Sequence, residues 1–518
     1  MITLRPYQKE PVRKAIDYFR EYNPEPALMV CPTAWGKSLL AAEVAASCPD
    51  PILVVQPTKE LLEQNLSKYR DLCGDLAPAG VYSASFGKKQ IDHVTFATIG
   101  SIKEIGAQFR ELGFRKMLID EAHLYPRKEQ SMLGQFLSDS GIRQVLGVTA
   151  TPLKLETFSE KQGDHFDKWS ELIMLTNLSP SGSFFKRILH VGQIQEMTAL
   201  GYWSPLTYEV LPFDRSNLQM NSSESEYTED SVVTAYEANN IRANIIAALN
   251  YHTERKHILV FVPSVDEAEN LAAFYPDSAA LSGQTPKKER ARIIEEFKTG
   301  RIRVLFNVNV LSTGFDYTKI DMICIGYSTA SIAKHYQVIG RGVRIDPEKT
   351  DCVIMDAGGN VARFGYAEDI RIEWNGDSWQ MYGTGDTLLT GIPVNTIGVI
   401  RREDVMRSKQ YPYFMDSLNF GKHRGKHLRD IPMSYLKWLL MNPAFNDDAI
   451  LRCNICRVML THVRDTRKDP PMDTLPDGQH AGEYMGMVPS GYLRWYYSSK
   501  EWNETNDSLR RGLELYMR

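Results

Sequence analysis

Three short stretches of this sequence carry residue types that could bind and cleave a phosphate ester. The first is PTAWGKS, residues 32–38, which follows an apolar run directly. At a helix N-terminus the backbone N–H groups of such a loop can surround a phosphate, while Lys37 reaches the outer phosphates and Ser38 binds Mg²⁺. Because the motif G-x-x-x-x-G-K-[ST] would have glycine where Cys31 stands, the loop alone is weak evidence for a nucleotide site.

Two further stretches carry charges of the kind that a hydrolytic site needs. KMLIDEAH ends an apolar run with Asp120 and Glu121, which could hold Mg²⁺ and orient the attacking water. HYQVIGRGVR places Arg341 and Arg344 three residues apart, which puts them on one face if the stretch is helical, and guanidinium groups match phosphate oxygens. A solvated strand end or a surface ion pair would explain either alone, whereas the ordered set predicts nucleotide hydrolysis.

The elements that must position these stretches alternate between short apolar runs and longer amphipathic ones. From 27 to 150 the apolar runs ALMVCP, ILVVQP, VTFATI, KMLIDE and QVLGVTA are separated by helical patterns, and the alternation returns from about 257. This alternation predicts parallel sheets covered by helices on both faces. We therefore expect two α/β domains in tandem and no other internal repeat.

Composition limits the class of protein. The 518 residues are 43% hydrophobic and 24% charged, which is typical of a soluble globular chain with more than one domain. No apolar run approaches a membrane span, and MITLRPYQKEPVRK lacks the apolar segment of a signal peptide, so we expect a cytoplasmic protein without a membrane partner. The formal net charge is −4, yet residues 401–518 hold 19 Lys+Arg and 15 Asp+Glu, which makes this part the better candidate for polyanion binding.

The ordered motifs resemble those of the superfamily 2 helicases. They are LRPYQ, PTAWGKS, QPTKELLEQN, TFATIGS, DEAH, TATP, LVFVPS, LSTGFD and QVIGRGVR, which together cover residues 1 to about 360. Within that superfamily the second domain is most similar to the RadD-type DNA-repair helicases. The resemblance implies an α/β fold of two tandem RecA-like parallel-sheet domains with a small, mainly helical C-terminal module. The expected boundaries are 1–200 for the first domain, 201–365 for the second, 366–400 for a linker and 401–518 for the accessory module.

The resemblance also implies a site for ATP and Mg²⁺ shared by the two domains. The implied catalytic residues are Lys37, Asp120, Glu121, Gln337, Arg341 and Arg344. The implied nucleotide contacts are Arg5, Gln8, Thr33, Ala34, Trp35, Gly36, Lys37, Ser38, Gly314 and Asp316. Ser38 and Asp120 would hold the metal, Gln8 would read the adenine, and Thr149 and Thr151 would link the nucleotide state to domain motion.

Nucleic acid would run across both domains on backbone amides and hydroxyls, which carry little sequence information. The matching positions are Pro57, Thr58, Thr98, Ser264 and Thr313. In the C-terminal module, LNFGKHRGKHLRDIPMSYLKWLL resembles a small module of phage and bacterial proteins. Its Lys422, Arg424 and Lys426 could contact phosphates, or could be a solvated turn over an aromatic core that includes Tyr435 and Trp438. YLRWYYSSKEW is expected to place its aromatic residues in a core as well.

Zinc is not expected in the C-terminal module. Cys453 and Cys456, with His462 as a possible third ligand, supply too few ligands, because structural zinc takes four.

These inferences predict an ATP-dependent DNA helicase or translocase that acts in replication, recombination or repair. Its partners would be single-stranded, forked or branched DNA, with single-strand-binding or recombination proteins, in a bacterium or a phage-infected host. Two alternatives stay open: an RNA helicase, and a nucleic-acid-binding scaffold with an impaired ATPase. The second is motivated by Ala34 and Trp35, which depart from the usual loop. We expect Ala34 to have negative φ and Trp35 to point away from the phosphates.

Overall fold

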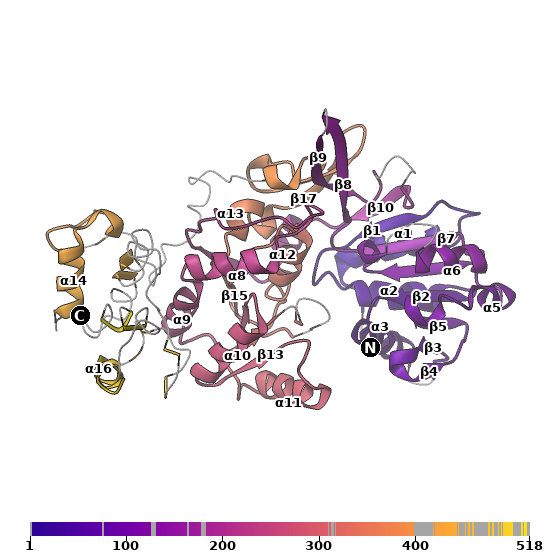
Figure 1. Cartoon of the computed structure of the whole chain (residues 1–518). Helices are drawn as coiled ribbons and strands as arrows, with labels where there is room; N and C mark the ends of the chain where they lie inside the picture. Colours follow the sequence, from indigo (N-terminus) through magenta and orange to yellow (C-terminus); the bar gives the residue numbers. More distant parts are fainter. Residues whose placement is uncertain are drawn as a thin grey trace.

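The structure is a computed structural model, in which two α/β units lie side by side and a small helical module lies beyond the second unit (Figure 1). It describes residues 3–397 except 75–76, 126–130, 163–164, 178–182, 309, 312–314 and 316, and beyond these 418, 420–442, 444, 451, 454–455, 458–459, 475–476, 479–480, 485, 488, 490–500, 509–510 and 512–514. Among these residues, no helix has both the length and the apolar character needed to cross a membrane.

The first unit is built on an eight-stranded sheet in the order β10-β1-β7-β6-β2-β5-β3-β4, in which only β3 and β4 pair antiparallel. Its strands are β1 (Ala27–Val30), β2 (Ile52–Gln56), β3 (Gly80–Ser83), β4 (Lys88–Lys89), β5 (Val94–Thr98), β6 (Lys116–Asp120), β7 (Gln144–Thr149) and β10 (Arg187–Val191). Its helices are α1 (Pro6–Tyr18), α2 (Lys37–Ser47), α3 (Lys59–Cys73), α4 (Ile99–Ile102), α5 (Gly106–Glu111) and α6 (Met132–Ser140). Separate buried clusters join α1, α2 and α3 to one face and α4, α5 and α6 to the other.

The second unit has a fully parallel sheet of six strands in the order β11-β16-β15-β12-β14-β13. Its strands are β11 (Leu206–Val210), β12 (Ile258–Phe261), β13 (Ser278–Leu281), β14 (Val304–Asn307), β15 (Met322–Ile325) and β16 (Cys352–Asp356). Its helices are α8 (Glu229–Ala238), α9 (Ile241–Tyr251), α10 (Val265–Phe274), α11 (Lys287–Lys298), α12 (Ile332–Ile339) and α13 (Asn360–Phe364). The order matches β1-β7-β6-β2-β5-β3 of the first unit strand for strand. The prediction of two tandem α/β domains with parallel sheets is confirmed.

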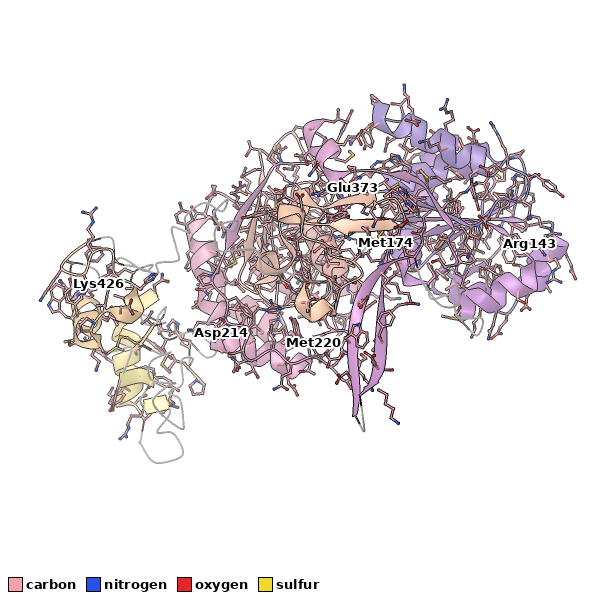
Figure 2. All side chains as sticks on the ribbon, turned by 90° about the horizontal axis from the view of Figure 1, so that it is seen from above. Arg143, Met174, Asp214, Met220, Glu373 and Lys426 are labelled. Carbon is pink, nitrogen blue, oxygen red and sulfur yellow. The ribbon has the colours of Figure 1, made fainter. Side chains whose placement is uncertain are left out.

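A second set of strands lies over the junction of the two units. β8 (Leu153–Gln162) and β9 (His165–Met174) form an antiparallel hairpin after β7, and β17 (Arg371–Trp374) and β18 (Trp379–Tyr382) form another after α13. Figure 2 shows Met174 and Glu373 close together where these hairpins meet. The backbone N–H of Gly391 donates to the carbonyl of Leu172 (2.8 Å), which joins the second hairpin region to β9.

Residues 366–397 therefore pack firmly, although a linker is expected over 366–400. Ile372, Met381 and Leu389 lie in the same buried cluster as side chains of both sheets. Gln193, just before α7 (Ile194–Ala199), exchanges two hydrogen bonds with the backbone of Ile372, at 2.7 and 3.2 Å. Because the segment is rich in Gly, Thr and Asp, its composition predicts a linker and does not reveal that these few apolar residues are buried.

The C-terminal module has its own buried cluster, in agreement with the expected small helical module. α14 (Met433–Met441) and α16 (Ser490–Ser498) contribute to it. Ala243 of α9 belongs to the same cluster, so the module packs against the second unit. Figures 1 and 2 place it on the side away from the first unit, with Lys426 at its surface.

Candidate nucleotide site between the two α/β units

The loop between β1 and α2 presents an open helix N-terminus. Gly36 precedes α2 with φ 99°, and no side chain caps the helix there. A Cβ at Gly36 would lie 2.4 Å from Nε2 of Gln8, so both conformation and space require glycine. Because the first N–H groups of a helix have no acceptor within the helix, this end offers several donors and a favourable dipole to an anion.

The backbone φ of Ala34 shows that one prediction is wrong. Its φ is 61°, in the left-handed region, whereas a negative φ is expected from its side chain. The loop needs left-handed backbone at both Ala34 and Gly36 to turn back into α2, and only one of the two is glycine. A Cβ in this region costs about 1–2 kcal/mol, so the loop keeps a strained residue that its surroundings must hold.

Trp35 points away from the loop's concave side, as predicted. Its side chain is only 1% exposed, and its ring packs edge-on against Tyr7 with centroids 5.5 Å apart. His190 lies on another side with centroids 6.0 Å apart, and a Cβ at Gly192 would be 3.0 Å from the indole nitrogen. The indole therefore anchors the loop to α1 and to the end of β10.

The side chain of Gln8 is hydrogen-bonded to the backbone of the same loop. Its Nε2 donates to the carbonyl of Trp35 (2.7 Å), and Tyr7 Oη donates to the same oxygen (2.9 Å). Gln8 Oε1 accepts from the backbone N–H of Arg5 (2.9 Å), which fixes the amide's orientation. Each amide atom keeps one further hydrogen-bonding position, so recognition of adenine by Gln8 stays a prediction.

Lys37, Asp120 and Glu121 form a charged cluster at the carboxyl end of β6, in which Asp120 is buried and Lys37 and Glu121 are partly buried. Lys37 Nζ lies 2.5 Å from Glu121 Oε1. Although burial favours the neutral amine, the two carboxylates outweigh it and raise the pKa of Lys37. Burial, followed by the charge of Glu121, raises the pKa of Asp120. Burial likewise opposes the charge on Glu121, but Lys37 outweighs it and the pKa of Glu121 is lowered.

Asn65 positions the Asp120 carboxylate, a role that the sequence does not reveal. Its Nδ2 donates to Asp120 Oδ2 (2.9 Å), and the backbone N–H of Glu121 donates to Oδ1 (2.9 Å). Asn65 lies in the quoted motif QPTKELLEQN, but the pairing is visible only after α3 packs beside β6. Each carboxylate oxygen keeps a lone pair for a cation, which suits Mg²⁺ held by one carboxylate, water and substrate phosphates.

His123 connects these carboxylates to the second unit. Its Nδ1 lies 2.8 Å from Thr149 Oγ1, and its Nε2 lies 3.5 Å from Nε2 of Gln337 on α12. Thr149 Oγ1 also accepts from the backbone N–H of Thr151 (3.1 Å). Burial lowers the pKa of His123, which keeps the imidazole neutral and able to accept as well as donate.

The second unit supplies the opposite wall of a cavity of about 320 Å³. The cavity is lined from both units by Arg5, Thr33, Ala34, Gly36, Lys37, Ser38, Asp120, Glu121, Gln337, Arg341 and Arg344, among others. Arg341 Nη1 donates to the carbonyl of Phe315 (2.6 Å), and its charge contributes to the lowered pKa of Glu121. The structure thus brings the predicted loop, the acidic pair and both arginines to one cavity.

The units touch directly beside this cavity. A Cβ at Gly340, at the end of α12, would lie 2.6 Å from Thr33 Oγ1. Trp203 Nε1 donates to the carbonyl of Thr33 (3.0 Å), and its ring stacks on Tyr336 with centroids 6.4 Å apart. Trp203 and Tyr336 were not among the predicted site residues, because aromatic residues in helical patterns are indistinguishable from core positions.

Two of the residues expected to contact nucleic acid, Thr58 and Ser264, cap helices. Thr58 Oγ1 accepts from the N–H of Leu61 (3.3 Å), and Ser264 Oγ accepts from the N–H of Glu267 (3.2 Å). Their own hydroxyl hydrogens remain able to donate to phosphate oxygens. Thr98 Oγ1 donates to Ser83 Oγ (3.2 Å). Pro57 and Thr58 also line the cavity described above.

Several predicted residues fall elsewhere. Thr313, Gly314, Asp316, Cys453, Cys456 and His462 lie outside the described residues. Lys422, Arg424 and Lys426 are exposed on a turn of the C-terminal module. Within the part of the chain that is described, no three His, Cys, Asp or Glu side chains cluster closely enough to hold a metal ion.

Comparison with known proteins identifies two family matches. Residues 1–154 match the family described as "Type III restriction enzyme, res subunit", and residues 241–346 match "Helicase conserved C-terminal domain". The chain is 25% identical over 372 residues to the putative mitochondrial ATP-dependent helicase irc3 of Schizosaccharomyces pombe, covering 68% of this chain and 57% of that protein. It is 22% identical over 332 residues to a 51.5 kDa protein of a Lactococcus phage, covering 62% of this chain and 64% of that protein.

The chain thus spans less than two thirds of the length of either relative. Among solved structures, the fragment of a putative HsdR subunit of a type I restriction enzyme from Vibrio vulnificus superposes with a TM-score of 0.50. That likeness has 15% sequence identity and covers 70% of this chain and 65% of that chain, so it supports the fold alone.

Proposed function

We propose, from the premise that this chain belongs to the superfamily 2 helicases, that it is an ATP-driven motor that moves on or remodels DNA. The observation that carries the proposal is the shared cavity, in which Lys37 and Glu121 of the first unit face Arg341 of the second. Positive groups from two separate bodies around one anion-sized space suit a substrate that draws the bodies together. Energy released there would alter the contact between the units.

The residues of the first unit would bind the triphosphate and hold the metal. The N–H groups after Gly36 and the ammonium of Lys37 offer donors to the β- and γ-phosphates, and Ser38 and Asp120 offer oxygen ligands to Mg²⁺. Bound Mg²⁺ would neutralise charge on the transferred phosphoryl group. Since burial raises the pKa of Asp120, a nearby cation would favour its charged form again.

The Lys37–Glu121 contact gives the site a way to delay hydrolysis until substrate is in place. While Lys37 lies 2.5 Å from Glu121, that carboxylate is held in its charged, weakly basic form. Transfer of Lys37 to a phosphate removes the main charge that lowers the pKa of Glu121. The carboxylate then becomes a better base toward the attacking water.

Contacts around the cavity would pass the change to both units. Thr149 and His123 connect the acidic pair to Gln337, and Thr33 touches Gly340. Thr58 and Ser264 stand at equivalent strand ends, β2 and β12, so that each unit can hold a nucleic-acid backbone. Alternate tightening of these two contacts would move the strand relative to the protein.

We assign the nucleic acid as DNA, in single-stranded, forked or branched form. This is supported by the sequence resemblance to RadD-type repair helicases, and a role in replication, recombination or repair follows from it. The phage relative supports a setting in a bacterium or a phage-infected host, where single-strand-binding or recombination proteins would be partners. The competing assignments are RNA as the track and a scaffold with an impaired ATPase.

Titration of ATPase activity with single-stranded DNA, duplex DNA, forked DNA and RNA tests the proposal. We expect stimulation by DNA and the greatest stimulation by forked or single-stranded substrates. Stimulation by RNA alone would overturn the assignment of DNA. Absence of any ATPase activity, with nucleic-acid binding unchanged by Lys37→Ala, would instead support the scaffold.

A further inference from the structure

The C-terminal module contains two copies of one sequence motif. Residues 418–438 and 475–495 share the pattern L-x-x-G-x-H-x-G-x-x-[LM]-x-x-[IV]-P-x-x-Y-L-[KR]-W without a gap. Eight of the 21 aligned positions are identical. This repeat contradicts the expectation of no repeat beyond the two α/β units, and it is hard to see because the identical positions are scattered.

The structure gives the two copies the same aromatic arrangement. The rings of His423 and Tyr435 are 4.5 Å apart at 70°, and those of His480 and Tyr492 are 4.3 Å apart at 70°. Tyr435 and Trp438 are 5.3 Å apart in the first copy. The matching pair in the second copy, Tyr492 and Trp495, is 5.2 Å apart.

Burial also agrees from one copy to the other. Four aligned pairs are buried in both copies, namely Leu418 with Leu475, Leu428 with Met485, Ile431 with Val488, and Leu436 with Leu493. Described helical residues follow each copy, with Leu451 and Ile455 buried after the first and Leu509 and Leu513 buried after the second. All of these side chains belong to one cluster, so the copies share a single core.

Trp438 and Trp495 are the exception to this packing. They are 51% and 59% exposed, although aromatic residues at these spacings are expected in the core. Packing does not require a tryptophan at an exposed position. Neighbouring positions differ in sequence between the copies, since Lys422, Arg424 and Lys426 of the first correspond to Gln479, Ala481 and Glu483 of the second. Both copies nevertheless keep the exposed tryptophan and a basic residue directly before it.

We propose that these two surfaces bind unpaired bases of single-stranded DNA. We name each surface an aromatic patch: His423, Tyr435, Lys437 and Trp438 in the first copy, and His480, Tyr492, Arg494 and Trp495 in the second. An exposed indole next to a tyrosine ring offers flat faces on which bases stack, and the adjacent cation complements the phosphate that follows. The inference rests on the proposed function for the choice of DNA as the ligand.

The copies differ in charge, which makes them unequal. The first patch lies beside the basic turn with Lys422, Arg424 and Lys426, whereas the matching sequence positions of the second copy, Gln479, Ala481 and Glu483, carry no positive charge. The first copy therefore contributes most of the salt-dependent affinity, and the second contributes mainly stacking. Because both copies share one core, a strand long enough to reach both patches gains from effective concentration.

Binding of labelled oligothymidines to the full chain, followed by fluorescence anisotropy at several salt concentrations, tests this inference. We expect Trp438→Ala and Trp495→Ala each to weaken binding of a long oligothymidine roughly five- to hundredfold, the range for loss of one stacked base. The double variant should be weaker than either, and Trp438→Phe should retain most of the affinity. ATPase activity without DNA should be unchanged.

Trp374→Ala is the matched control, because Trp374 is 54% exposed but lies on β17, outside the module. It should bind oligothymidine as the unchanged protein does. If the double variant Trp438→Ala/Trp495→Ala bound oligothymidine with wild-type affinity, the inference would be overturned. This would hold even if the variant no longer bound some protein, because the proposed ligand is single-stranded DNA. If the motor showed no DNA-stimulated ATPase but oligothymidine binding still depended on both tryptophans, the proposed function would fail and this inference would stand.

Discussion

The two α/β units share a strand order but differ at the carboxyl ends of matching strands. After β1, the first unit has a tight loop that leaves α2 uncapped and ready for an anion. After the matching β11, the second unit has a long loop, and α8 begins with a cap from Thr228 and two acidic residues, Glu229 and Asp230. A capped, acidic helix start disfavours phosphate. Under the proposed function, the loop after β1 binds the phosphates, and the second unit contributes side chains to the same site.

The strands that follow these in chain order keep the same chemistry in both units. β2 and β12 occupy matching places, and each is followed by a hydroxyl residue, Thr58 or Ser264, that caps the next helix. Each unit thus has its own proposed contact with nucleic acid, whereas the residues of the proposed hydrolytic site are divided between the two units. Variants in the two units should therefore have different, not equivalent, effects.

The largest effect is expected from Arg341→Ala. Its guanidinium group faces the cavity from the second unit, and an arginine in this role is worth roughly 10³-fold or more in turnover. Nucleotide affinity should change little, because the loop of the first unit is intact. Steady-state ATPase rates and equilibrium nucleotide binding would separate the two quantities.

Two variants control for that experiment. Arg341→Lys keeps the charge but loses the planar fork of donors, so it should not restore full turnover. Arg301→Ala removes an exposed arginine of the same unit and should behave as the unchanged protein. Equal losses of nucleotide affinity and turnover in Arg341→Ala would contradict the assignment of nucleotide binding to the first unit and of Arg341 to the hydrolysis step.

Lys37→Ala should lower both nucleotide affinity and turnover, the latter by roughly 10²- to 10³-fold, the usual cost of removing one group that stabilises developing charge. Its ammonium lies in the cavity and has Glu121 as its partner. Lys14→Ala, which removes an exposed lysine of α1, is the matched control. Nucleotide titration calorimetry would contradict the account if Lys37→Ala bound ATP normally.

The sequence predicts much of this site because its motifs are contiguous. PTAWGKS, DEAH and QVIGRGVR each place their charges at the end of a predicted element, and the structure brings all three to one cavity. Asn65, Trp203 and Tyr336 could not be predicted, since each acts through a contact between elements far apart in the chain. The φ of Ala34 is set by the closure of the whole loop, which a single residue's preference does not reveal.

Asp120→Asn is expected to have a smaller effect, which is a gain in the stability of the fold. Because the folded state raises the pKa of Asp120, its charged form at neutral pH costs stability. Asparagine removes that charge, and Asn65 can rotate so that its unpaired Oδ1 accepts from the new amide. We expect the free energy of unfolding at neutral pH to rise, because a buried charge is removed, while ATPase activity is lost.

The pH dependence gives this prediction its sign. As pH falls through the folded-state pKa of Asp120, the wild-type carboxyl becomes neutral and its cost disappears, so the advantage of the asparagine variant should shrink. The lowered pKa of Glu121 acts the other way and removes stability as pH falls, but it is present in both proteins. Urea unfolding at several pH values would contradict the account if Asp120→Asn were less stable at neutral pH.

The smallest effect is expected from Ala34→Gly. Relief of a left-handed Cβ should stabilise the fold by about 0.5–1 kcal/mol, after the greater flexibility of glycine in the unfolded chain is subtracted. Gly36→Ala is the matched opposite change and should destabilise by about 1–2 kcal/mol or more, since its Cβ would also meet Gln8. Thermal unfolding of both variants would show whether the strain lies at Ala34; equal stability of Ala34→Gly and wild type would indicate that it does not.

The central claim is that groups from the two units act on the same phosphate, and a double-mutant cycle on ATPase kcat/KM tests it most directly. Lys37→Ala, Arg341→Ala and the double variant would be measured with saturating single-stranded DNA. We predict that the double variant is far less impaired than the product of the two single losses, because residues that serve one reacting group are not independent. A loss equal to that product, or a wild-type rate for Arg341→Ala, would contradict the account.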